Sequence, residues 1–168
     1  MTDAHLHLIV NHFPIIGTII GLGILITGII IKNNIVKNTA YVIFIFSAIF
    51  AFASMFTGEG AEEMVEDMPS VGKKIIHEHE EIAEKLAIVT YLLGLLSIAG
   101  LYTNIKNHVR ANVVSYAIMV VAVVAVIIAK EVGTSGGEIR HTEIRENTLG
   151  TLENAITNPS ENNEEDKD

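Results

Sequence analysis

The sequence contains no cysteine. This absence excludes structural disulfides, thiolate metal sites, iron–sulfur clusters and covalent haem attachment through a Cys-x-x-Cys-His motif. The chain is also poor in basic residues, and its formal net charge of -9 argues against nucleic acid as a partner. The N-terminal stretch has neither a basic segment nor a small-residue cleavage site, so we expect the first apolar run to be retained.

Apolar residues make up 49% of the 168 residues, and they are grouped in long runs. Four runs carry almost no charge: Phe13 to Ile31, Ala40 to Thr57, Ile82 to Leu101, and Ala111 to Ala129. Each is close to the roughly 20 residues that cross a hydrocarbon core, where the backbone must form its own hydrogen bonds. The sequence therefore predicts an all-α, up-down-up-down bundle of four transmembrane helices over residues 1–145. The remaining residues, 146–168, form an acidic tail that is too polar to fold alone.

The connections between the runs differ in charge. Lys32 and Lys37 lie between the first two runs, and Lys106 and Arg110 lie between the last two, without any acid. The middle connection is instead rich in acids, namely Glu59, Glu62, Glu63, Glu66 and Asp67. Because basic connections stay in the cytoplasm, we expect a multi-pass protein of the bacterial inner membrane with both termini in the periplasm.

This topology brings dispersed histidines together. Six of the seven histidines would lie at the outer ends of the helices: His5, His7, His12, His77, His79 and His141. Only His108 would lie at the cytoplasmic end. The carboxylates Glu59, Glu63, Glu131 and Glu138 belong to the same outer end. The sequence therefore predicts a histidine-rich site on the periplasmic face.

His79 falls in the helical seam that should face the other helices. Ile75, His79, Ile82 and Leu86 are separated by four, three and four residues, which is the spacing of one packed face. His77 lies on another face and is expected in solvent. His79 is either a ligand or a hydrogen-bonded core histidine.

His12 stands two residues before Pro14, at the start of the first apolar run. Proline suits the first turn of a helix and disrupts its interior, so the helix either begins near Phe13 or is kinked there. In both cases His12 lies near the membrane interface, where a free backbone carbonyl can accept its proton. The alternative to a ligand is an ordinary interfacial histidine.

Three glycines, Gly133, Gly136 and Gly137, follow the fourth run. They either end the helix or allow a flat ligand or another helix to approach closely.

Small residues also form stripes within the runs. Ala122, Ala125 and Ala129 lie on one face of the fourth run, and Gly17 and Gly21 share a face of the first. Such stripes allow close helix packing, which we expect within the chain rather than between copies.

Three chemistries suit this end of the bundle. Two histidines on opposing helices can hold a b-type haem, and histidines with carboxylates can hold an iron, zinc or copper ion. Glu138 and His141 form one Glu-x-x-His pair of the kind found in di-iron bundles, and Glu59, Glu63 and Glu80 could add oxygens. The third possibility is no cofactor, with the histidines only closing the bundle.

Catalysis and transport find little support. No nucleophile motif or phosphate-binding loop is present, and the middle of each run is almost entirely apolar. We therefore do not expect an enzyme acting on its own, or a single copy that conducts ions.

Three stretches, "HLIVNHFPIIG", "HEHEEIAEKLA" and "GTSGGEIRH", give the chain a resemblance over residues 5–141 to a family of four-helix bacterial membrane proteins called domain of unknown function 2231. That family has a His-x-x-x-x-His-Phe-Pro-like opening, a histidine at the third span, and a Gly-Gly pair followed by a histidine. The matching residues here are His12, Phe13, Pro14, His79, Gly136, Gly137 and His141. A difference is that His7 is followed by Leu8 and not by the proline often found in the family. The association of that family with c-type cytochrome domains implies redox work.

These observations lead to one functional expectation. We expect a periplasmic b-type haem or metal site used in electron transfer, with a c-type cytochrome or respiratory complex as partner and the lipid bilayer around it. The expected cofactor-binding residues are His12, His79, His141, Gly136 and Gly137, and the expected metal ligands are His12, His79, Glu59, Glu138 and His141. The alternative is a non-catalytic membrane subunit or scaffold.

Overall fold

The structure, a computed structural model, describes residues 2–65, 72–141 and 144–145. The acidic tail predicted over residues 146–168 lies outside them. The described helices are α1 (Asp3–Val10), α2 (His12–Ile30), α3 (Asn34–Val65), α4 (Lys73–Ile105) and α5 (Ala111–Arg140). Since only Asn11 separates α1 from α2, these two helices together form the first of four long rods.

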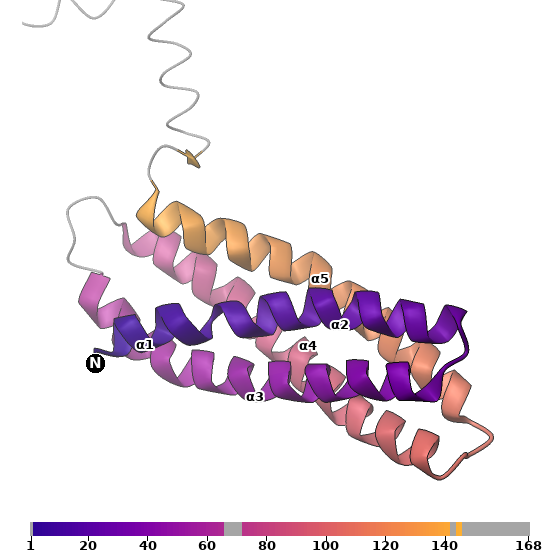
Figure 1. Ribbon diagram of the computed structural model, residues 1–168. Helices are drawn as coiled ribbons and strands as arrows, with labels where there is room; N and C mark the ends of the chain where they lie inside the picture. The colour runs from indigo at the N-terminus through magenta and orange to yellow at the C-terminus, as the bar shows by residue number, and fades with distance from the viewer. Residues whose placement is uncertain (1, 66–71, 142–143, 146–168) are drawn as a thin grey trace, which may run out of the picture.

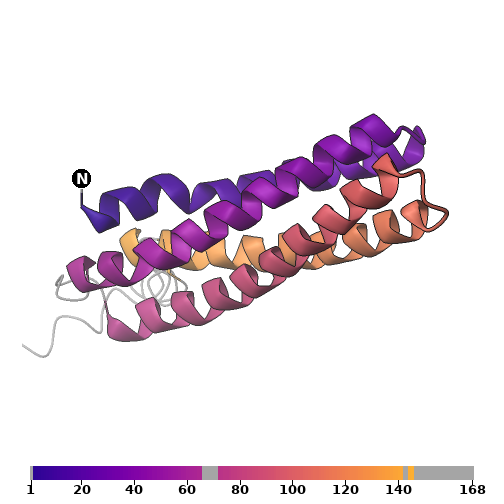
Figure 2. The ribbon, with the colours of Figure 1, turned by 90° about the horizontal axis from the view of Figure 1, so that it is seen from below.

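The four rods form an antiparallel bundle. Each packs against the next in the chain, and α5 returns to contact α2 (Figures 1 and 2). One end, which we call the histidine end, collects the start of α1, the end of α3, the start of α4 and the end of α5. The opposite end, the basic end, holds the connections between α2 and α3 and between α4 and α5. The prediction of an all-α, up-down-up-down four-helix bundle is confirmed.

All four rods are long and apolar enough to cross a membrane, with 28, 31, 33 and 29 residues. At 1.5 Å per residue they are roughly 42–50 Å long, whereas the hydrocarbon core is about 30 Å thick. The excess lies mainly at the histidine end. There α3 continues past Thr57, α4 begins at Lys73, well before Ile82, and α5 continues past Ala129. The sequence runs thus marked the apolar parts of the helices, while the polar turns at this end are also helical.

Small residues let the helices approach closely in the core. The largest buried side chains, including Tyr41, Phe44 and Leu93, have no exposed surface. The predicted alanine stripe on α5 is buried within the chain, because Ala122, Ala125 and Ala129 are also fully covered. Large apolar side chains elsewhere point outward, as expected for a surface that contacts lipid.

The first rod is kinked, which decides between the two predicted alternatives for its start. α1 precedes Pro14, and the chain leaves regular helix at Asn11. Pro14 has no N–H to donate to the carbonyl of Val10, so the helical ladder is interrupted one turn before the proline. Pro14 itself is buried in the first turn of α2.

The glycines near the end of α5 do not terminate it. Gly133, Gly136 and Gly137 all lie inside the helix, which ends at Arg140. Of the two predicted roles, helix termination is wrong for these residues. Packing of α5 against α4 maintains the helix through this glycine-rich turn, and Gly136 makes a close contact that we describe below.

Two glycines on α2 provide a matched test of this packing. A Cβ atom on Gly21 would lie 2.5 Å from the ring of Phe44, whereas one on Gly23 would have no neighbour within 4 Å. We expect Gly21→Ala to lower the free energy of unfolding by about 1–3 kcal/mol, the usual cost of overpacking, and Gly23→Ala to leave it unchanged or raise it. Denaturant unfolding in detergent measures both. Equal effects of the two substitutions would show that α2 and α3 do not pack as described.

Candidate functional site

At the histidine end, the side chains of two histidines from different helices point into the bundle. His7 lies on α1 and His79 on the second turn of α4, and both are half-buried. His79 was predicted to face the bundle, and it does so together with Ile82 and Leu86, which pack in the core. Ile76, and not Ile75, is the buried residue one turn earlier.

The ring of His7 is held by the end of α3. Its Nδ1 lies 3.0 Å from the backbone carbonyl of Ser54 and 3.3 Å from Oγ1 of Thr57. A carbonyl only accepts hydrogen bonds, so Nδ1 of His7 carries the proton and donates it. In the neutral ring, Nε2 then has a free lone pair.

The ring of His79 is held in the same way by α5. Its Nδ1 lies 2.9 Å from Oγ of Ser135, and that hydroxyl donates its own proton to the carbonyl of Val132 at 3.2 Å. Because the hydroxyl proton is already used, Ser135 accepts from Nδ1 of His79. The neutral ring of His79 therefore also has its Nε2 lone pair free.

Each ring is packed against a glycine. A Cβ atom on Gly136 would lie 3.1 Å from Cε1 of His79, and one on Gly58 would lie 3.6 Å from Cε1 of His7. These two positions have no side-chain bulk beside the imidazoles. The pair thus combines fixed rings, free Nε2 atoms and bare backbone, which is how proteins orient histidine ligands through a second hydrogen bond.

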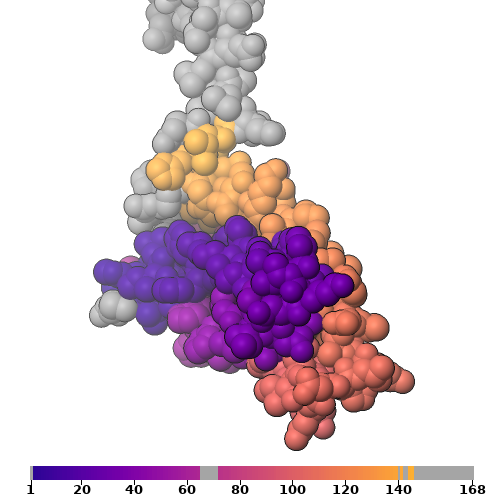
Figure 3. Space-filling view, turned by 45° about the vertical axis from the view of Figure 1, so that its right-hand side comes forward, coloured from indigo at the N-terminus to yellow at the C-terminus, as the bar shows by residue number. Residues whose placement is uncertain are grey.

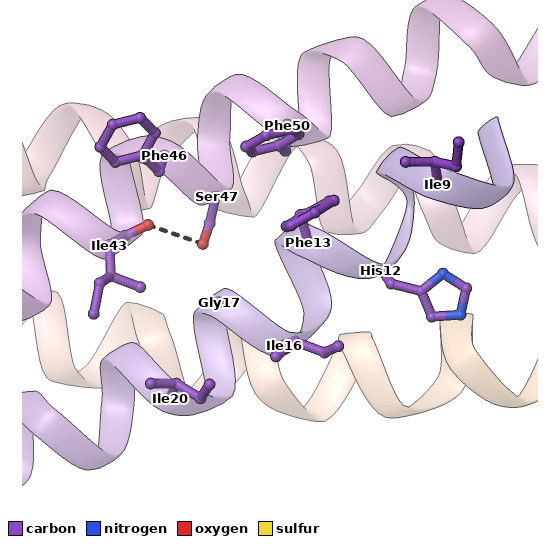
Figure 4. A pocket seen from close by; sticks show the side chains of 10 residues that line it. All are labelled: Ile9, His12, Phe13, Ile16, Gly17, Ile20, Ile43, Phe46, Ser47 and Phe50. Atoms are coloured by element: carbon purple, nitrogen blue, oxygen red, sulfur yellow. Dashed lines mark hydrogen bonds between the residues drawn. The ribbon is translucent and has the colours of Figure 1, made fainter. Parts of the chain in front are cut away.

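His12 occupies a different place. It is exposed, and its Nδ1 donates to the carbonyl of Leu8 at 3.1 Å, the kind of backbone partner predicted for it. Figure 4 shows its ring at the end of a groove of about 490 Å³ between α2 and α3, near the stacked rings of Phe13 and Phe50. His12 is two residues from the buried Val10 and therefore lies off the inward face, while His7, three residues before Val10, lies on it.

The other predicted site residues are dispersed. Gly136 contacts His79, but the nearest neighbour of a Cβ atom on Gly137 would be Ile144. His141 is exposed and follows the last residue of α5. Glu59 is exposed on α3, and Glu138 is half-buried on α5. Within residues 2–65, 72–141 and 144–145, no three histidine, aspartate or glutamate side chains gather as a metal-binding group.

His7 could have been found from the sequence by extending the buried seam of the first rod backwards. The buried residues Val10, Pro14, Thr18 and Gly21 follow one another at steps of four, four and three. His7 stands three residues before Val10 and continues this face, whereas His12 does not. The interruption expected at Pro14 hid the seam, because the helix was expected to begin or bend there.

Comparisons with known proteins do not name this bundle: no family model, curated protein or solved structure matches the chain. The resemblance to the domain of unknown function 2231 family therefore stays a prediction based on sequence motifs.

Ser135 provides a test of the ring orientation of His79. We expect Ser135→Ala to remove the acceptor of Nδ1–H and to shift the ring toward a mixture of its two neutral tautomers. Nitrogen-15 NMR of labelled histidine measures the tautomer directly. Thr134→Ala is the matched control, since the exposed Thr134 bonds only to the carbonyl of Lys130 on its own helix. A spectrum of His79 unchanged by Ser135→Ala would contradict the assigned hydrogen bond.

Proposed function

We propose that the protein is a membrane-bound electron carrier in which His7 and His79 hold a b-type haem at the histidine end. The observation that supports this most directly is the pair of half-buried imidazoles, each held through its Nδ1 so that the Nε2 lone pair is free. A haem iron with two imidazole ligands passes between its ferric and ferrous forms, which supplies one-electron transfer. His7 takes the place for which the sequence suggested His12 or His141.

The donor set favours haem over a bare metal ion. A zinc ion held by protein side chains usually needs three or four ligands, and the described residues offer no group of three. An axially ligated haem needs only two histidines, because the porphyrin supplies the other four nitrogens. The glycine contacts make room for the two imidazole rings themselves, which keeps both histidines in place at this end.

Single-histidine variants test the assignment. We expect His7→Ala and His79→Ala each to lose the visible haem spectrum of protein purified from haem-supplied cells, because one axial ligand is removed. His12→Ala and His77→Ala are matched controls that should keep the spectrum, since both residues are exposed. Retained insertion, seen by membrane fractionation, separates loss of cofactor from loss of fold.

Three results would contradict the proposal in different ways. A wild-type protein with no Soret absorption, even after haem reconstitution, would reject haem. Stoichiometric iron, zinc or copper without haem would favour the metal-ion alternative. Neither haem nor metal, with His79→Ala changing only stability, would favour a scaffold in which the histidines close the bundle.

We further propose that the histidine end faces the periplasm of a bacterial inner membrane and that a c-type cytochrome or respiratory complex is the redox partner. The acid-free connections carrying Lys32, Lys37, Lys106 and Arg110 support this orientation through the positive-inside rule. Acidic side chains crowd the end that would meet the partner, including Glu59, Glu63, Glu78 and Glu81.

The lack of native cysteine allows a direct test of orientation. We expect Lys74→Cys at the histidine end to react with a membrane-impermeant maleimide in intact spheroplasts. Val109→Cys at the basic end should react only after the membrane is opened. Both positions are exposed, with Val109 89% accessible and the Lys74 side chain 90% accessible. The reverse labelling pattern would place the histidines in the cytoplasm.

A further inference from the structure

A buried lysine at the basic end has no acid to pair with. Lys37 lies in the first turns of α3, and only 3% of its surface is exposed. Neither residues 4–58 nor residues 86–130 contain an aspartate or a glutamate. These two stretches include all of α2, both connections at this end and the parts of α3, α4 and α5 nearest to it. The carboxylates of the described residues thus lie toward the other end.

The side chain of Lys37 packs closely against Gly28 of α2. A Cβ atom on Gly28 would lie 2.8 Å from the backbone nitrogen of Lys37 and 2.9 Å from its Cγ. The stem therefore packs where α2 lacks a side chain, and the ammonium is directed to α5. There Nζ donates to Oδ1 of Asn112 at 3.2 Å. An ammonium has three N–H donors, so this neutral partner satisfies only part of its capacity.

The start of α5 adds a second feature that suits an anion. Asn112 belongs to the first turn of α5, which begins at Ala111 without a side-chain cap. The N–H of Ala111 donates to the carbonyl of His108 at 2.9 Å, and that of Val114 to the carbonyl of Arg110 at 3.0 Å. The N–H groups of Asn112 and Val113 are the ones in this turn that can face an anion, and the helix dipole favours a negative group nearby. Because Asn112 is exposed, Nζ of Lys37 lies just beneath the surface at this turn.

Other cations lie at the same end. Lys32, Lys106 and Arg110 are all exposed in the two connections. The helices next to these connections are neighbours, since α2 packs against α5 and the two surfaces border one another (Figure 3). A buried ammonium without a counter-charge is costly, and the described residues supply none here. The site at this end is therefore suited to a negatively charged group that the described part of the chain does not supply.

We propose that Lys37 and the first turn of α5 bind the phosphate of an anionic lipid headgroup. The phosphate oxygens would accept from Nζ of Lys37 and from the backbone N–H groups at the start of α5, while the exposed cations attract the lipid from its leaflet. A lipid is favoured over free phosphate because the site lies at the end of an apolar bundle whose outward surface contacts acyl chains. This inference does not depend on the haem.

Lipid nanodiscs of defined composition test the proposal. Phosphatidylglycerol is added to phosphatidylcholine discs holding the full-length protein, and the rise in melting temperature is followed as a titration. We expect a saturable rise for the wild type and about tenfold weaker binding for Lys37→Met, which keeps the stem over Gly28 but removes the charge. Lys106→Met is the matched control and should bind nearly as the wild type does.

Asn112→Asp tests the same idea without removing the lysine. A carboxylate at this position would supply the missing counter-charge from within the chain. We expect it to raise the melting temperature in pure phosphatidylcholine and to abolish the response to phosphatidylglycerol. This variant remains informative if Lys37→Met fails to fold.

The proposal is overturned if the wild type does not respond to phosphatidylglycerol, if Asn112→Asp still responds fully, or if a folded Lys37→Met does so. Equal weakening by Lys37→Met and Lys106→Met would indicate diffuse attraction to the leaflet and no built site. Inorganic phosphate that stabilises the protein in phosphatidylcholine discs as well as phosphatidylglycerol does would reject the lipid as the occupant.

Discussion

Close contact between a glycine on one helix and a large side chain on its neighbour is the interaction on which this bundle depends. In a membrane the helices gain little from the hydrophobic effect, since lipid tails are as apolar as leucine, and close packing must hold them together. Gly21 receives Phe44 and Gly100 receives Tyr41 in the core. At the ends the same device receives polar groups, because Gly136 contacts His79 and Gly28 contacts Lys37. Contact between a glycine and a larger side chain therefore recurs in the apolar middle and at both polar ends.

The polar ends differ in how their groups are satisfied. At the histidine end, Ser54 and Ser135 fix the two imidazoles and leave one nitrogen of each free. At the basic end, Tyr41 bonds to Ser115 at 2.7 Å and Asn104 bonds to Asn38 at 2.9 Å, so most polar groups find partners inside the chain. The exceptions are Oδ1 of Asn104, which is buried without a hydrogen-bond partner among the described residues, and Lys37, whose charge a single amide oxygen cannot neutralise. Each end thus has polar atoms that the fold holds in place but leaves without a full set of hydrogen-bond or charge partners.

The fold was accessible from the sequence because its signal is carried by long apolar runs, which in lipid can only be helices. The polar turns at the histidine end gave no such signal, and α3, α4 and α5 extend several residues beyond the predicted runs. The residues of the site were harder to predict from the sequence, and the reason is local. His79 lies on an uninterrupted seam and was predicted to face the bundle. His7 lies before the apolar run, and the interruption expected at Pro14 hid the buried face that continues from the run back to His7.

The burial of Lys37 could not be predicted from the sequence, for a different reason. A lysine in a short basic connection has the pattern of a solvated residue that sets orientation, and its sequence neighbours do not distinguish it from Lys32. The difference arises from tertiary packing, since the stem of Lys37 lies against Gly28 on another helix, whereas Lys32 is exposed in the connection. Lys37 can therefore contribute to orientation through its charge, as the positive-inside rule requires, while its position is set by packing. With the anionic lipid that we propose as its partner, Lys37 would stabilise the bundle most where the leaflet supplies negative charge, which would couple the stability of the fold to the side of the membrane on which this end lies.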